Sequence, residues 1–141
     1  MYFDTSYIAK FYLNESDSSR VRALVRHGDA IDSSLWALAE FHAVLHRHLR
    51  ERTIKRSDAR ALALRFSEHI EEGLWRLVPV TEALLRRSSA LLMSAPDDLF
   101  LRTGDAVHLT TANDVGEREV WTNDHHMLAA APYFGLVGRS V

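Results

Sequence analysis

The chain has 141 residues, of which 47% are hydrophobic and 26% are charged, a balance typical of one globular domain rather than a disordered segment. The formal net charge of −2 predicts no general attraction to nucleic acid, so a polyanionic partner would need a local basic patch or a bound metal ion. The lack of cysteine excludes disulfides, thiolate catalysis and cysteine-ligated zinc, and it fits a reducing cytoplasm.

The expected elements alternate along the chain. Short apolar strands are expected at residues 2–3, 30–31, 75–80, 119–121 and 135–137. Helices are expected at residues 5–13, from 18 to 27 before a Gly28 cap, from the Ser33-Ser34 cap to about 52, from the Ser57 cap to about 73, from Thr81 to about 94, at 104–113 and at 124–130. This order predicts an α/β fold with a parallel sheet covered by helices on both faces.

The sequence contains no internal repeat and no linker-like stretch, so we expect a single domain over residues 1–141. It also contains no secretory signal pattern and no apolar run of about 18 residues, so we expect neither export nor a membrane contact.

Four acidic residues are predicted near one edge of this sheet. Asp4 and Asp124 follow strands, Asp105 lies in the first turn of a helix, and Glu40 interrupts the apolar stretch SSLWALAEFHAVL. Each aspartate alone is equally well explained as a helix cap, and Glu40 as a side chain that reaches solvent beside an apolar stripe. Together, however, four carboxylates would repel one another at the carboxyl ends of parallel strands, where sites form. Mg²⁺ or Mn²⁺ would relieve that repulsion and engage a substrate phosphate.

Four segments of the chain resemble the successive motifs of PIN-domain proteins and, more narrowly, of VapC-type toxins of bacterial toxin–antitoxin pairs. These segments are FDTSYIAKFYLNE, LAEFHAVL, LRTGDAVHLTTA and VWTNDHHMLAAAPYFGL, and they cover nearly the whole chain. The resemblance implies a PIN-like three-layer α/β/α sandwich with a small, mainly parallel sheet of four or five strands. It also implies a Mg²⁺- or Mn²⁺-dependent endoribonuclease that leaves a 5′-phosphate and a 3′-hydroxyl.

The resemblance also implies roles for particular residues and partners. Asp4, Asp105 and Asp124 would be catalytic metal ligands, and Glu40 would bind the metal directly or through water. Ser6 and Thr122 would hydrogen-bond to an acidic ligand or to a metal-bound water. The expected partners are an RNA substrate and a VapB-like antitoxin that docks across the acidic groove, in a homodimer or a toxin–antitoxin hetero-oligomer. The expected location is a prokaryotic cytoplasm.

Basic residues supply weaker signals. Arg47, Arg102 and Lys10 are candidate RNA contacts, with Arg47 foremost because it lies seven residues, or about 10 Å, beyond Glu40 on the same helix face. The alternative for the basic stretch at residues 46–56 is a solvated helix end whose cations complement the helix dipole. His42 and His46 have the i, i+4 spacing of zinc ligands, but a third ligand is missing.

Three other functions stay open at this point. One is a PIN nuclease of RNA processing that is not a toxin, and another is a PIN-fold module that binds without catalysis. The third is a phosphoacceptor receiver domain, but this class needs an acid pair after the first strand and a lysine at a late strand end. No lysine follows Lys55 in the chain.

Overall fold

The computed structural model describes residues 1–25 and 30–141, in which five parallel strands form one sheet in the order β3-β2-β1-β4-β5. The strands are β1 (Tyr2–Phe3), β2 (Ile31–Ser34), β3 (Trp75–Val78), β4 (Glu119–Trp121) and β5 (Val137–Arg139). The central strand is β1, the first element of the chain, and both of its residues are fully buried. The predicted parallel sheet is therefore confirmed, with five strands.

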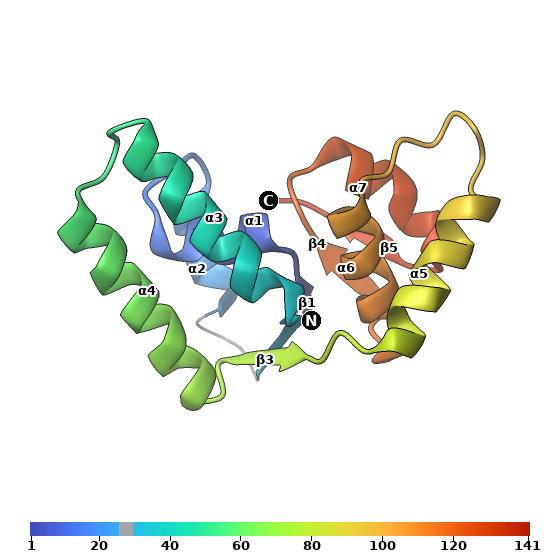
Figure 1. Cartoon of the computed structure of the whole chain (residues 1–141), viewed down its shortest axis with the longest axis horizontal. Helices are drawn as coiled ribbons and strands as arrows, with labels where there is room; N and C mark the ends of the chain where they lie inside the picture. Colours follow the sequence, from blue (N-terminus) through green and yellow to red (C-terminus); the bar gives the residue numbers. More distant parts are fainter. Residues whose placement is uncertain (26–29) are drawn as a thin grey trace.

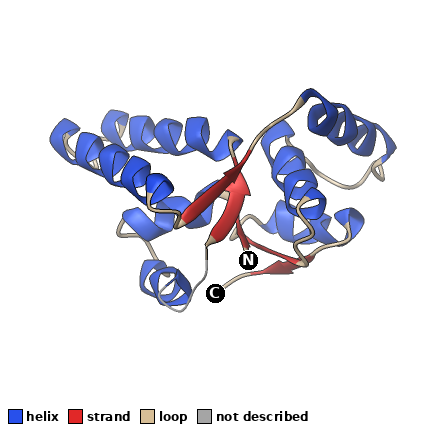
Figure 2. Cartoon of the chain, turned by 90° about the horizontal axis from the view of Figure 1, so that it is seen from below, coloured by secondary structure: helices blue, strands red, loops and turns tan. Residues whose placement is uncertain are grey.

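Helices cover both faces of this sheet. They are α1 (Thr5–Tyr12), α2 (Ser18–Val25), α3 (Trp36–Arg50), α4 (Arg56–Glu71), α5 (Glu82–Ser94), α6 (Thr103–Asp114) and α7 (His125–Ala130), followed by the 3₁₀ helix η1 (Ala131–Phe134). Figure 1 shows α1 to α4 on one side of the strands and α5 to α7 on the other, and Figure 2 shows the strands between the two groups. The described residues thus form the three-layer α/β/α sandwich that the sequence predicts.

Two hydrophobic cores lie on the two faces of the sheet, and β1 contributes to both. Because successive side chains of a strand point to opposite faces, Phe3 and Tyr2 belong to different cores. Phe3 packs in an aromatic core that includes Trp75 and the helices α1 to α4. Tyr2 packs with Leu109 of α6 and Val120 of β4. The central strand therefore ties the two halves of the molecule together.

Two predicted N-terminal caps are corrected by the structure. Ser33 and Ser34 are the last residues of β2, where they pair with β3, so the strand extends beyond the predicted residues 30–31 and α3 starts at Trp36. The Ser34 hydroxyl still accepts a hydrogen bond from the Trp36 backbone N–H at 3.2 Å. Ser57 is also inside its helix, because α4 begins at Arg56.

The last strand also differs from its prediction. Gly135 has a φ of 72° and ends η1 instead of starting a strand, because this left-handed conformation suits glycine and breaks the extended backbone. β5 consequently runs over Val137–Arg139 rather than residues 135–137. The predicted Gly28 cap, with the end of its helix, lies outside the described residues.

The parallel arrangement places the carboxyl ends of β1, β2 and β4 at one edge of the sheet. Asp4 directly follows β1, α3 with Glu40 follows β2, and Asp124 caps the helix that follows β4. The sheet thus gathers three of the four predicted acids at this edge, as expected for a site in a parallel sheet. Within residues 1–25 and 30–141, no helix combines the length and apolar character needed to cross a membrane.

Candidate active site

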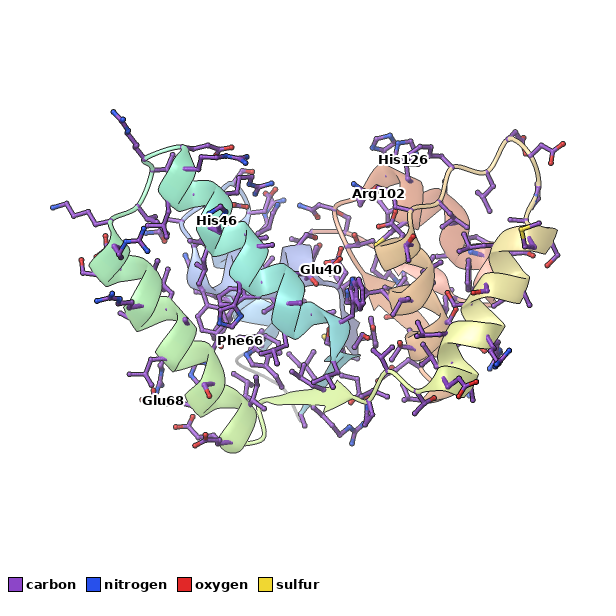
Figure 3. The ribbon with its side chains drawn as sticks, in the orientation of Figure 1. Glu40, His46, Phe66, Glu68, Arg102 and His126 are labelled. Atoms are coloured by element: carbon purple, nitrogen blue, oxygen red, sulfur yellow. The ribbon has the colours of Figure 1, made fainter. Side chains whose placement is uncertain are left out.

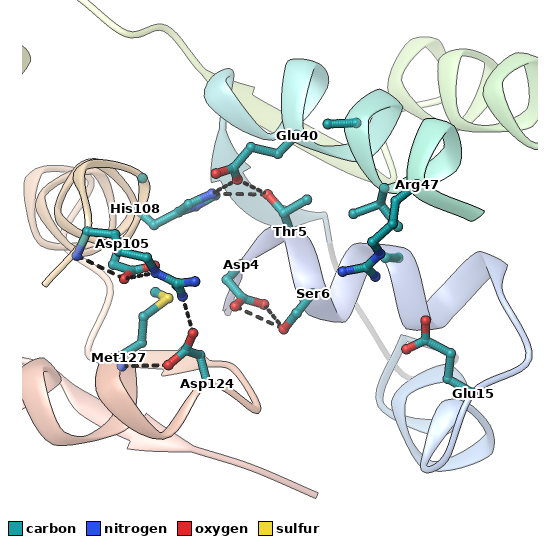
Figure 4. Close-up of a pocket in the computed structure, with 15 residues that line it drawn as sticks. Asp4, Thr5, Ser6, Glu15, Glu40, Arg47, Asp105, His108, Asp124 and Met127 are labelled. Carbon is teal, nitrogen blue, oxygen red and sulfur yellow. Dashed lines mark hydrogen bonds and ion pairs between the residues drawn. The ribbon is translucent and has the colours of Figure 1, made fainter. Parts of the chain in front are cut away.

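A cavity of about 520 Å³ opens at this edge of the sheet, and all four predicted acids line it. Figure 4 shows Asp4, Glu40, Asp105 and Asp124 on separate elements that converge on the cavity. Asp4 belongs to the start of α1, Glu40 to α3, Asp105 to α6 and Asp124 to the start of α7. Residues separated by up to 120 positions in sequence therefore share one site.

Asp4 is at once a helix cap and a member of the site. Its carboxylate accepts the backbone N–H of Tyr7 at 2.9 Å, the Thr122 hydroxyl at 2.6 Å and the Ser6 hydroxyl at 2.7 Å. Burial raises the pKa of Asp4 above its ordinary value, although the hydrogen bonds from Thr122 and Ser6 oppose this effect. The donors are all neutral, so they orient the carboxylate and do not cancel its charge.

Glu40 reaches the cavity from the middle of α3 through a set of side-chain hydrogen bonds. Its carboxylate accepts from the Thr5 hydroxyl, from the Trp36 indole N–H at 3.1 Å and from His108 Nε2 at 3.0 Å. Burial acts to raise the pKa of Glu40, but the interaction with His108 and the hydrogen bonds from Thr5 and Trp36 outweigh it and hold the pKa below its usual range. Glu40 is therefore held as a carboxylate inside an otherwise apolar stretch.

His108 of α6 connects Glu40 to the central strand. Its Nδ1 lies 2.8 Å from the hydroxyl of Tyr2, and its Nε2 lies 3.1 Å from the Thr5 hydroxyl as well as near Glu40. Since a carboxylate only accepts, Nε2 carries the proton and Nδ1 accepts from Tyr2, an assignment made from the hydrogen-bond network. From its position three residues after Asp105, His108 is expected to pack or hydrogen-bond within the helix pair, and in the structure it links α3, α6 and β1.

Gly104 permits the close approach of α3 and α6. A Cβ atom at this position would lie 2.6 Å from Glu40 Oε1 and 3.4 Å from Trp36 Nε1. The carboxylate of Glu40 therefore occupies the space that any larger residue would need.

Asp105 and Asp124 share a single cation, the guanidinium of Arg102. Arg102 Nε lies 2.9 Å from Asp105 Oδ2, and Nη2 contacts both Asp105 Oδ1, at 3.3 Å, and Asp124 Oδ2. The other oxygen of Asp124 caps α7 by accepting the His126 backbone N–H at 2.8 Å. Burial acts to raise the pKa of Asp124, but the capping hydrogen bonds and the charge of Arg102 lower it below its ordinary value.

The donor set suits a hard divalent cation. Five carboxylates and two guanidinium groups line the cavity, so its lining carries three net negative charges when His108 is neutral; Glu15 is the fifth acid and Arg47 the second arginine. Oxygen ligands are what Mg²⁺ and Mn²⁺ prefer, and the buried charge of Asp4 has only neutral donors around it.

The acids are not yet gathered around one point. Within the described part of the chain, no three His, Cys, Asp or Glu side chains lie close enough together to hold a metal ion in their present positions. Arg102 occupies oxygens of two of the four acids. The residues present therefore fit a divalent cation in chemistry, while Asp105 and Asp124 are paired with Arg102.

The candidate RNA contacts have different positions. Arg47 lines the cavity, and Figure 4 shows it on α3 beyond Glu40, as its spacing predicts. Arg102 lines the cavity too, opposite Glu40 in Figure 3, but its guanidinium binds acids. Lys10 does not line the cavity: it is 8% exposed and its ammonium lies 3.9 Å from Asp17. The Lys10 side chain is thus engaged in an ion pair within the fold, and its contact with RNA stays a prediction.

Sequence reasoning misses four residues of the site, namely Thr5, Glu15, Gly104 and His108. Thr5 and Gly104 are each adjacent to a predicted acid, so a search of the positions beside Asp4 and Asp105 could have found them. His108 lies three residues after Asp105 on the same helix, which is a similar signal, whereas Glu15 carries none. Of the two histidines considered for zinc, His42 has its Nδ1 2.7 Å from the Leu38 carbonyl oxygen of its own helix.

The sheet order, the two helical layers and the acidic cavity define the class to which this protein belongs. The family model for the PIN domain matches residues 1–132, and the chain belongs to this family. Among solved structures, the fold is similar to that of VapC20 from Mycobacterium tuberculosis, which is described as a sarcin–ricin loop cleaving toxin. The TM-score is 0.72 at 20% sequence identity, over 92% of this chain and 93% of that chain. A search of curated proteins finds no match.

Proposed function

We propose that this protein is a VapC-type endoribonuclease that cleaves RNA phosphodiesters with Mg²⁺ or Mn²⁺ and acts as the toxin of a toxin–antitoxin pair. The observation that carries the proposal is the convergence of four carboxylates on one cavity at the carboxyl edge of a PIN-domain sheet. The likeness of fold to VapC20, a toxin that cleaves RNA of the sarcin–ricin loop, supports the toxin assignment.

The proposed ligands are Asp4, Asp105 and Asp124, with Glu40 binding directly or through water. When bound, the divalent cation supplies Lewis-acid activation of water and neutralises charge at the phosphodiester. The chain prepares this site by orienting Asp4 through the hydroxyls of Ser6 and Thr122. The capping hydrogen bonds of Asp124 fix a second ligand in the same way.

The remaining steps belong to side chains that line the same cavity. A carboxylate oxygen of the acidic cluster accepts the proton of the attacking water as the water oxygen bonds to phosphorus. The bond from phosphorus to the 3′ oxygen breaks and that oxygen takes a proton from solvent, so the expected products carry 5′-phosphate and 3′-hydroxyl ends. Arg47, one of the two arginines of the cavity, binds an RNA phosphate about 10 Å along α3 from Glu40. The RNA therefore lies along α3 with its scissile phosphate at the acids.

The proposed regulatory partner is a VapB-like antitoxin that presents a basic residue to the carboxylates. The three net negative charges of the cavity lining support this expectation, because a cationic side chain would be attracted to the site that the metal ion needs. We also propose a homodimer or a toxin–antitoxin hetero-oligomer.

The experiment compares RNA cleavage by the purified protein and its Asp4→Asn and Asp105→Asn variants with Mn²⁺ or Mg²⁺, on total RNA and on a ribosomal RNA hairpin. Asp97→Asn, which changes an exposed loop acid, is the matched control. We expect both site variants to lose at least about 100-fold in rate, because each removes a ligand charge, while the control cleaves like the wild type. Wild-type rates in either site variant would overturn the catalytic assignment.

A growth assay separates the toxin from its alternatives. Induction of the chain without a partner is expected to arrest bacterial growth, and Asp4→Asn is expected to remove the arrest. RNA cleavage without growth arrest would identify a processing nuclease instead. Binding of RNA without cleavage by the wild type would identify a binding module. Sequencing the 5′ ends that appear after induction would locate the cleaved sites.

A further inference from the structure

Arg102 occupies the position between two acids where a cation is expected. It precedes α6, and its side chain folds back along the first turn so that Nε and Nη2 meet both oxygens of Asp105. Nη2 also reaches Asp124, which belongs to a different element. One guanidinium thus bridges two carboxylates and reduces their mutual repulsion, and the three groups together keep one net negative charge.

The arginine is held by polar contacts at the surface rather than by burial. The Arg102 side chain is 58% exposed, whereas the side chain of Asp105 is only 10% exposed. An exposed ion pair contributes little net free energy, since the released guanidinium is hydrated at once. The guanidinium can therefore dissociate from the acids at a small cost in free energy. The carboxylate of Asp105, which is mostly buried, stays in place.

Arg102 and a divalent cation would compete for the same two carboxylates. Both oxygens of Asp105 contact Arg102, and so does the oxygen of Asp124 that does not cap α7. Asp105 Oδ1 and Asp124 Oδ2 each keep a further lone pair for a metal ion, but the positive charge of that ion would repel the guanidinium at close range.

We propose that Arg102 is an internal counter-ion of the acidic cluster, which a divalent cation displaces from Asp105 and Asp124 when it binds. The inference rests on the proposed metal site but not on RNA cleavage. It explains why no metal-binding group is assembled among the described residues although all four acids line one cavity. Arg102 holds the carboxylates of Asp105 and Asp124 together before the metal ion binds.

The first test is a calorimetric titration of the full chain with Mn²⁺ in the absence of RNA. We expect Arg102→Gln to bind Mn²⁺ about three- to tenfold more tightly than the wild type, because the ion no longer competes with an ion pair. Arg102→Lys keeps the charge but loses the planar fork that contacts both acids, and it is also expected to bind more tightly than the wild type.

Arg47→Gln is the matched control, because Arg47 also lines the cavity and the variant removes the same charge. If Arg102 affects Mn²⁺ binding only through its charge in the cavity and not through its contacts with the acids, Arg47→Gln will tighten Mn²⁺ binding as much as Arg102→Gln does. That result would contradict the proposal. Weaker Mn²⁺ binding by Arg102→Gln would also overturn it, because Arg102 would then position Asp105 for the ion. So would an absence of Mn²⁺ binding in both the wild type and Arg102→Gln.

The second test follows Arg102 itself in the wild-type protein. Its Nε–H, which donates to Asp105 at 2.9 Å, is expected to give a protected signal in nitrogen-edited NMR spectra. Titration with diamagnetic Mg²⁺ should move this signal to the position and exchange rate of a solvent-exposed arginine as the site fills. A signal that stays protected at saturating Mg²⁺ overturns the proposal. Neither test uses RNA, so a protein that binds metal but cleaves nothing would contradict only the proposed function.

Discussion

The two halves of the acidic site hold their carboxylates by different means. On the side of α1 and α3, Asp4 and Glu40 accept hydrogen bonds from hydroxyls, a backbone N–H, an indole and the imidazole of His108. On the side of α6 and α7, Asp105 and Asp124 share the guanidinium of Arg102. The first half is fixed by its own neutral donors, whereas the second half is fixed by a cation.

This difference separates orientation from neutralisation. Neutral donors set the direction of a carboxylate and leave its charge in place. In this half burial raises the pKa of Asp4, whereas the interactions with His108, Thr5 and Trp36 lower the pKa of Glu40. In the other half the capping hydrogen bonds of Asp124 and the charge of Arg102 together lower its pKa. A divalent cation would therefore meet Asp4 and Glu40 already oriented, and it would compete with Arg102 for Asp105 and Asp124.

The largest expected effect is on stability, and it comes from replacing His108 on the side of α1 and α3. His108→Leu should lower the free energy of unfolding by about 2–4 kcal/mol, because the buried hydroxyl of Tyr2 loses its partner and Glu40 loses a donor. Urea unfolding measures the loss. Tyr2→Phe should cost about 1 kcal/mol, and the double variant less than the sum of both, since it leaves no orphaned hydroxyl. Strictly additive losses would contradict the coupling of Tyr2 to His108.

The next effect is on activity and leaves stability nearly unchanged. In Gly104→Ala the new Cβ would meet Glu40 Oε1 at 2.6 Å, so the carboxylate must move while the helix gains a better helix former. We expect RNA cleavage with Mn²⁺ to fall about 10- to 100-fold, because small displacements of a ligand are costly in catalysis. Rates of a defined RNA substrate measure this loss.

Gly116→Ala is the control for that substitution. Gly116 has a φ of 80° and open space around its Cβ position, so alanine should cost about 1 kcal/mol in stability through its backbone alone. The cleavage rate below the unfolding temperature should stay at the wild-type value. Equal rates in Gly104→Ala and the wild type would show that Glu40 needs no fixed position.

The sequence was sufficient for the parts of this comparison that depend on local pattern. Strand-then-acid order predicts Asp4 and Asp124 at the sheet edge, and the alternation of strands and helices predicts the parallel sheet that gathers them. Capping and site membership looked like rival explanations for these aspartates. In the structure one side chain does both, because Asp124 caps α7 with one oxygen and directs the other to the cavity.

The partners of the acids could not be read from local pattern. Thr122 lies 118 positions from the Asp4 carboxylate that it orients, and His108 lies 68 positions from Glu40, so only the assembled fold defines these hydrogen bonds. A basic residue near a nuclease site favours phosphate, so the sequence predicts Arg102 as an RNA contact. The structure adds that its position, three residues before Asp105, lets its guanidinium pair with that carboxylate.

A smaller effect on stability should have opposite signs for Asp4 and Asp105, which represent the two halves of the site. In metal-free buffer, Asp4→Asn is expected to raise the free energy of unfolding at pH 7 by about 1 kcal/mol, because it removes a buried charge that has only neutral donors. Asp105→Asn should lower it by less than about 1 kcal/mol, because it breaks the half-exposed ion pair with Arg102. Urea unfolding with a chelator measures both, and changes of the same sign would contradict the comparison.

The smallest expected effect is the pH dependence of the difference in stability between Asp4→Asn and the wild type. Burial raises the pKa of folded Asp4, so the folded state binds its proton more readily than the unfolded chain does. The stability linked to this proton is present below the ordinary pKa of about 4 and is lost as the pH rises through the folded pKa. The advantage of Asp4→Asn over the wild type should therefore be largest at pH 7 and should fade toward pH 4.

Asp124 should show the opposite trend. Its lowered pKa stabilises the folded state above the ordinary pKa, and this stabilisation is lost as the pH falls through the folded pKa. Asp124→Asn should accordingly be less stable than the wild type at pH 7 and approach it in acid. Urea unfolding of both variants between pH 4 and 7 tests the pair. An advantage of Asp4→Asn that grew as the pH fell would mean that Asp4 is neutralised by a cation after all, as the other half of the site is.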